Sequence, residues 1–292
     1  MNMHTRITQQ GVLAGAVRQA CQWRLLTLWA FFLLLPCLVL VLPVWFTLGA
    51  GLDYSVHAAS LAKELDLLAL ADLLHGQAHR SGALLMCAGL ALGLTFMLSP
   101  LLSGMVVTAA RAHSAPGFGM LLGGARLEYG RMLRMLLWAI VPLGAAGALG
   151  NFAVDAAARY GERAILESNA QLANIGAYLV LGLLLTLAHA SIDAGRAALA
   201  LDARRTSAIN AWWLGCKMLV KRPGATLVVY FGLSAAGLAL AAALAYARIH
   251  LPPISTLGLV LGFAITECGV LALAWMRSAR LMAMMALARA AN

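Results

Sequence analysis

The feature that most constrains the fold of this chain is a long segment without charged side chains. It begins at Pro223, and no charged residue follows until Arg248. An α-helix needs roughly 20 mostly apolar residues to cross a bilayer core of about 30 Å, so this segment is long enough to span a membrane. A basic and aromatic sequence precedes it, SAINAWWLGCKMLVKR, and such flanks are typical of the membrane–water interface.

The composition of the whole chain agrees with a membrane environment. Apolar residues make up 62% of the 292 residues and charged residues 11%, against roughly 25% charged residues in a typical globular domain. A soluble fold of this size could not bury so much apolar surface. We therefore expect an all-α, polytopic membrane protein in which residues 1–292 form a single transmembrane domain.

The apolar runs predict six transmembrane helices. Their approximate ranges are 25–48, 82–110, 135–154, 172–192, 224–245 and 254–276. The first run exceeds the 7–15 apolar residues of a signal peptide and lacks a small-residue cleavage site, so we interpret it as a retained first helix. Residues 55–76 carry charges between regularly spaced leucines, which predicts an amphipathic helix on the outer membrane surface.

The distribution of charge predicts the orientation of these helices. With both termini in the cytoplasm, 16 of the 21 Lys and Arg residues lie on the inner side and five on the outer side, in agreement with the positive-inside rule. The predicted location is the bacterial inner membrane, and the predicted partners are the lipid bilayer and other inner-membrane or cytoplasmic proteins. The net charge of +10 comes from the membrane flanks, and no separate basic patch indicates nucleic-acid binding.

The six helices are expected to form three hairpins with similar flanks. Each hairpin begins with small residues and two basic positions, which are Arg18 and Arg24, Arg126 and Arg131, and Lys217 and Arg222. Each ends in an exit of small residues and arginine, TAARAHS, DAGRAALALDARR and MRSARLMAMMALARA. Two interpretations are open. Basic inner flanks are common to all such hairpins, or one unit has been triplicated, as internal repeats often build membrane folds.

This pattern of flanks and exits resembles the six-helix membrane domain attached to some bacterial glycerophosphodiester phosphodiesterases, and related inner-membrane proteins that stand alone. The resemblance covers nearly the whole chain, but it rests on composition and spacing. It implies a membrane-embedded accessory role. The chain has no soluble phosphodiesterase domain, so the resemblance implies no catalytic residue here.

Glu267 is the most informative single residue, because it lies near the middle of the sixth apolar run. A charged side chain at the centre of a bilayer costs about 2.5–3.5 kcal/mol on insertion scales. Such a residue usually faces the interior of a helix bundle, where it marks a path for protons, ions or substrate. The alternative is a protonated or paired glutamate that only fixes helix packing.

A second group of polar residues lies at the inner ends of the helices. His189 and Asp193 are four residues apart and Arg196 follows three later, so all three share one helix face. Arg111, with Thr108, occupies the equivalent end of the second helix and Arg277 that of the sixth. We expect His189, Asp193, Arg111, Arg196 and Glu267 to form a polar cluster. The alternative is arginines that extend to the membrane surface and an aspartate in water.

On the outer side, Asp72, His75 and His79 have the spacing of metal ligands on one face of a helix. Three polar residues on a solvated helix are also ordinary, and no second-shell partner is evident. The chain contains no nucleophile set, P-loop or dinucleotide fingerprint. We therefore predict no catalytic residue, cofactor or metal.

These observations lead to three functional hypotheses. The first is a non-enzymatic accessory or scaffold subunit of an envelope or transport assembly. The second is a small-molecule, lipid or proton-coupled transporter that uses Glu267. The third is a lipid-modifying enzyme with its site at the outer face around Asp72, His75 and His79.

Cysteine labelling tests the orientation. In a variant without native cysteines, a single cysteine in the 193–222 connection should react with a membrane-impermeant thiol reagent only after the membrane is opened, because this basic connection faces the cytoplasm. A single cysteine in the 155–170 connection should react in intact cells. Labelling of the 193–222 connection from the periplasm would contradict the predicted orientation.

Overall fold

The computed structural model describes Gly11 and residues 14–52, 81–112, 114–164, 166–251 and 255–290. The long elements in these ranges are α2 (Trp23–Leu52), α5 (Ser81–Arg111), α6 (Phe118–Trp138), α7 (Ile140–Gly161), α8 (Glu167–Leu201), α9 (Ala208–Lys221), α10 (Pro223–Ile249) and α11 (Thr256–Arg289). Six stretches are long and apolar enough to cross a membrane, and α6 and α7 together form one of them. The expectation of an all-helical, multi-pass membrane protein is therefore confirmed for the described residues.

The helix bounds follow the apolar runs closely at some ends and not at others. α8 continues past Ile192 to Leu201, and α11 continues past Met276 to Arg289. Both extensions are rich in alanine and leucine, the α11 extension also in methionine, all of which favour helix, and neither contains proline. A drop in hydropathy therefore marks where these helices leave apolar surroundings, and not where they stop. The outer helix predicted at 55–76 lies outside the described residues.

The third apolar run, predicted at 135–154, is divided between two helices. α6 ends at Trp138 and α7 begins at Ile140, with Ala139 between them. Pro142 has no N–H to donate to the carbonyl of Trp138, so the ladder of helical hydrogen bonds is interrupted at this point. α6 can therefore leave the direction of α7 and pack across the ends of other helices.

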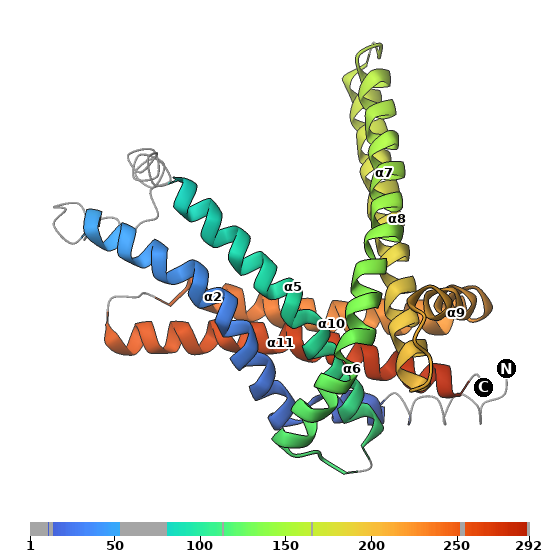
Figure 1. The fold of residues 1–292 in the computed structure, drawn as a ribbon. Coiled ribbons are helices and arrows are strands. Elements are labelled where there is room, and N and C mark those ends of the chain that lie inside the picture. The colour runs from blue at the N-terminus through green and yellow to red at the C-terminus, as the bar shows by residue number, and fades with distance from the viewer. Residues whose placement is uncertain are drawn as a thin grey trace.

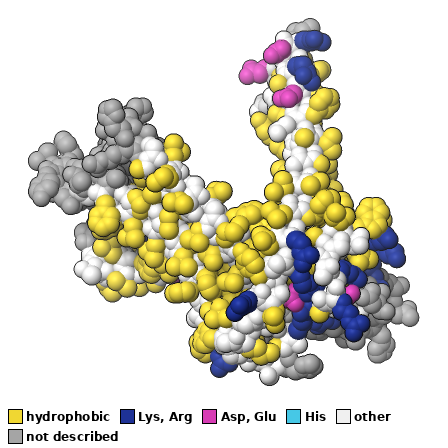
Figure 2. All heavy atoms as spheres, in the orientation of Figure 1, with side chains coloured by type: hydrophobic (Ala, Val, Ile, Leu, Met, Phe, Trp, Pro, Cys, Tyr) yellow, Lys and Arg dark blue, Asp and Glu magenta, His cyan; other side chains and the backbone are white. Residues whose placement is uncertain are grey.

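Consecutive long helices lie side by side in three pairs, α2 with α5, α7 with α8, and α10 with α11 (Figure 1). The pairs leave a common base in different directions (Figure 1). We define the base as α6, α9 and the C-terminal parts of α5, α8 and α11. Figure 2 shows apolar side chains along the pairs, whereas charged side chains gather at the base and at the far tip of the α7–α8 pair.

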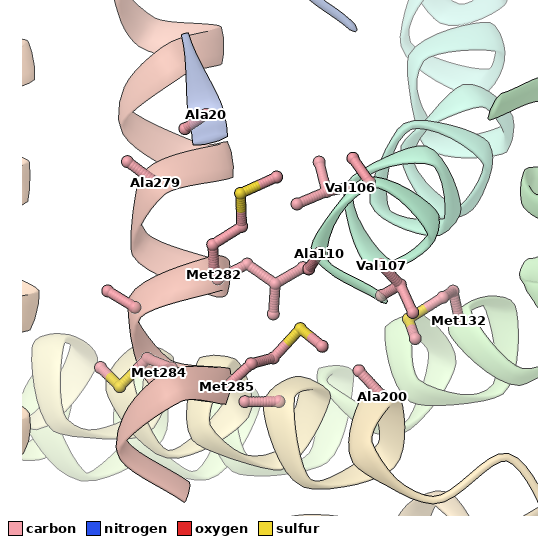
Figure 3. Packing of buried hydrophobic residues seen from close by; sticks show 14 of the residues in the cluster. Ala20, Val106, Val107, Ala110, Met132, Ala200, Ala279, Met282, Met284 and Met285 are labelled. Atoms are coloured by element: carbon pink, nitrogen blue, oxygen red, sulfur yellow. The ribbon is translucent and has the colours of Figure 1, made fainter. Parts of the chain in front are cut away.

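The main buried cluster of the described structure lies largely in the base and is built mostly from alanine, leucine and methionine. Met282 and Met285 of α11 reach toward Val106 of α5 and Ala200 of α8 (Figure 3), and all four side chains are buried. Methionine is unbranched and fills irregular gaps between helices. The small residues around it let the ends of α5, α8 and α11 approach closely.

The closest helix contact in the base involves two glycines. A Cβ atom added to Gly215 of α9 would lie 2.8 Å from the carbonyl carbon of Ala194 and 2.8 Å from the Cα of Gly195 in α8. These neighbours are backbone atoms, which cannot move aside as the end of a flexible side chain can. The contact between α8 and α9 therefore requires glycine at position 215.

We predict that Gly215→Ala separates α8 from α9 and lowers stability by about 1–3 kcal/mol, the usual effect of overpacking. Gly232→Ala in α10 is the matched control, because a Cβ there meets nothing within 4 Å. The control should be neutral or slightly stabilising, since alanine favours helix over glycine. Thermal unfolding in detergent, followed by tryptophan fluorescence, measures both. Equal midpoints for the two variants would contradict the close contact.

Candidate functional site

A buried carboxylate lies where the α7–α8 and α10–α11 pairs meet. Asp193 of α8 is 5% exposed. Its Oδ2 lies 2.7 Å from Nε of Arg280 on α11, and its Oδ1 accepts a hydrogen bond of 3.2 Å from Nη1 of Arg196. Arg280 is also buried, so both members of this ion pair are shielded from water. A buried charge without a partner is strongly destabilising, and the pair therefore fixes α8 against α11.

A histidine and a tyrosine extend this network toward α10. His189 Nδ1 lies 3.8 Å from Oδ2 of Asp193 and 2.9 Å from the hydroxyl oxygen of Tyr230. The guanidinium of Arg280 stacks over the Tyr230 ring at 4.7 Å and donates a hydrogen bond of 3.0 Å to Ser234. We call these residues, with Arg196, the Asp193 network. It joins three helices through charged and polar side chains.

A partly open cavity of about 270 Å³ lies beside the Asp193 network. His189, Asp193 and Arg196 contribute its wall on α8, and Arg277 contributes from α11. The other lining residues have apolar or hydroxyl side chains. They are Trp29, Leu33, Thr95, Ser99, Leu102, Ser103, Val106, Leu136, Ala139, Leu143, Ile192 and Leu281. One side of the cavity is therefore charged and the rest is largely apolar.

A second buried network holds the C-terminal end of α8. Glu128 of α6 pairs with Arg111 at 2.6 Å and with Arg131 at 2.5 Å. Both arginines also donate to carbonyl groups at the end of α8, Arg111 to Ala200 and Arg131 to Leu199. The last carbonyls of a helix have no partner within the helix and carry partial negative charge, so the two guanidinium groups cap α8.

The structure brings some of the predicted site residues together and separates others. His189, Asp193 and Arg196 lie in one network, whereas Arg111 lies in the second network with Glu128. Glu267 belongs to neither. It precedes Arg277 by ten residues on α11, which places it about 15 Å further along the helix axis. Asp72, His75 and His79 lie outside the described residues, and the described residues contain no group of three potential metal ligands.

Three important residues of these networks were not among the predicted ones. Arg280 and Tyr230 are far from Asp193 in sequence and reach it through the packing of helix pairs. Glu128 belonged to a segment interpreted only as the start of a hairpin, with small residues and two basic positions. A glutamate among small residues and arginines in an amphipathic helix is the signal that would have identified it. No comparable signal marks Tyr230, which lies in an apolar run.

Comparison with protein-family models, curated proteins and solved structures finds no match for this chain. The arguments about function therefore rest on the residues and on the geometry.

Asp193→Asn should leave Arg280 buried without a full counter-charge and lower stability by about 3 kcal/mol, as for other broken buried ion pairs. Arg196→Gln should have a smaller effect, because this arginine is more exposed than Arg280 and can reach water. The double variant Asp193→Asn/Arg280→Met should recover most of the lost stability, since no buried charge remains unpaired. A double variant that is no more stable than Asp193→Asn alone would contradict the coupling of Asp193 and Arg280.

Proposed function

We propose that this chain is a non-enzymatic integral protein of the bacterial inner membrane, an accessory or scaffold subunit of an envelope or transport assembly. One observation carries the proposal. Between 11% and 22% of the most apolar window of each span is buried inside the chain. The three helix pairs therefore bury little surface against one another, and they leave extended apolar faces for lipid and for other membrane proteins.

The proposed arrangement is three hairpins that cross the membrane outward and back, with both termini and the base on the cytoplasmic side. The dense basic charge at the base supports this orientation through the positive-inside rule. The pairing of consecutive helices is compatible with a threefold repeat and with the resemblance to the membrane domain of glycerophosphodiester phosphodiesterases. That domain is likewise an accessory to another activity, which agrees with the proposed role.

The use of charge within the base also favours a structural role. Glu128, Arg111 and Arg131 are engaged with one another and with the end of α8. Asp193 and Arg280 are engaged in fixing α8 to α11. These groups hold helices in place.

Site-specific photocrosslinking tests the scaffold role. Benzoylphenylalanine at Phe46, Phe152 and Phe263 places one probe on each helix pair, at side chains that are 59–72% exposed. Phe32, which packs against the core, is the control position. We expect crosslinks to specific membrane proteins from at least one exposed position and none from Phe32. Adducts to lipid alone at all three exposed positions would contradict a scaffold role.

A transporter that uses Glu267 is the second candidate, and one observation favours it. Glu267 lies within an apolar span, and it forms no ion pair with a described residue. An unpaired carboxyl group at this depth is typical of a proton or ion path.

Glu267→Gln distinguishes the two candidates. In a scaffold the variant should insert normally and give unchanged crosslinks from the exposed positions, because a neutral amide is no harder to place in a span than a carboxylate. In a proton-coupled transporter it should abolish proton movement into vesicles that contain the purified protein, measured with a pH-sensitive dye. Glu267→Asp is the control that retains the carboxyl group.

A further inference from the structure

The cavity beside the Asp193 network carries more positive charge than the chain neutralises. Two guanidinium groups, those of Arg196 and Arg277, line the cavity with the carboxylate of Asp193, and Arg280 contacts that carboxylate without lining the cavity. Arg277 is repelled by the other two arginines and attracted by Asp193, yet it makes no hydrogen bond or ion pair with a described residue. Positive charge that lines a cavity at the end of apolar spans attracts an anion.

The hydroxyl groups of the cavity wall can both donate and accept hydrogen bonds, whereas its guanidinium groups can only donate. Ser99 lines the cavity, and its hydroxyl makes no hydrogen bond to a described residue. A ligand that accepts hydrogen bonds and carries negative charge matches the two guanidinium groups of this wall.

We propose that this cavity binds a phosphate group, with Arg277 and Arg196 as its principal ligands and the Ser99 hydroxyl as a neutral donor. A phosphate oxygen pair matches the planar fork of a guanidinium, which is why arginine is favoured for phosphate recognition. The cavity of about 270 Å³ lies just below the roughly 300–1,000 Å³ of sites for drug-sized ligands. Its size therefore suits a headgroup better than a whole lipid.

The walls of the cavity identify the source of the phosphate as a membrane lipid. Leu33, Leu102, Val106 and Leu143 line the parts away from the arginines. A soluble phosphate would gain nothing from these apolar side chains. An anionic phospholipid presents its phosphate beside the upper part of its acyl chains, and this combination matches a charged wall next to apolar ones. This binding site goes beyond the accessory role proposed above and does not depend on it.

The test uses the full chain in detergent with three probes, namely phosphatidylglycerol, phosphatidylcholine and inorganic phosphate. The shift of the thermal unfolding midpoint with ligand concentration gives an apparent affinity, since a ligand that binds the folded state stabilises it. Arg277→Gln removes a cavity ligand and breaks no ion pair of the chain. Arg126→Gln is the matched control, because Arg126 is an exposed arginine of α6 that does not line the cavity.

We expect phosphatidylglycerol to stabilise the protein more than phosphatidylcholine, and Arg277→Gln to weaken its apparent affinity about tenfold, the usual effect of one lost charge-assisted contact. Arg126→Gln should leave the affinity within about twofold. Arg277→Lys should recover part of the binding, since it retains the charge but not the fork. Stabilisation by inorganic phosphate that depends on Arg277, without an effect of phosphatidylglycerol, would keep the phosphate site and overturn the lipid source. Equal effects of the Arg277 and Arg126 substitutions would overturn the site itself.

Discussion

The structure depends on the burial of charge where three apolar helix pairs meet. Asp193 and Arg280 are both buried away from water. Their mutual attraction offsets the lost hydration only while the two groups stay in contact. Apolar faces in a bilayer give no comparable preference, because lipid tails solvate a leucine as well as another helix does. The charged contacts therefore carry the specificity that apolar packing between spans lacks.

α8 is the helix on which both buried networks converge. Its residues 189–196 form the Asp193 network with α10 and α11, and one turn later its last carbonyls accept hydrogen bonds from Arg111 of α5 and Arg131 of α6. The close contact between Gly195 and Gly215 adds α9 on the opposite side. The arrangement explains why α8 extends well beyond its apolar run. The extension supplies the backbone groups and small residues that the base needs.

The sequence was sufficient for the features that depend on local pattern. Six spans follow from hydropathy, and the shared face of His189, Asp193 and Arg196 follows from helical spacing. It was not sufficient for contacts between helices far apart in the chain, such as Asp193 with Arg280, because several arginines at helix ends are equivalent as candidates until the packing is known. Arg111 illustrates this, since it shares the predicted depth of Asp193 but pairs with Glu128. Glu267 is a different case. It is conspicuous in the sequence because it lies within an apolar span, but in the structure it does not join the polar network at the end of that span.

The arginines around Asp193 differ in what they contact. Arg196 both pairs with Asp193 and lines the cavity, whereas Arg277 lines the cavity without pairing. A phosphate in the cavity would bring the local charge closer to neutrality without displacing Arg280 from Asp193. It would therefore lower the repulsion among three arginines on α8 and α11 while leaving the ion pair between those helices intact. On this argument an anionic lipid acts as a structural component of the junction, and the stability of the base should depend on the lipid composition of the surrounding membrane.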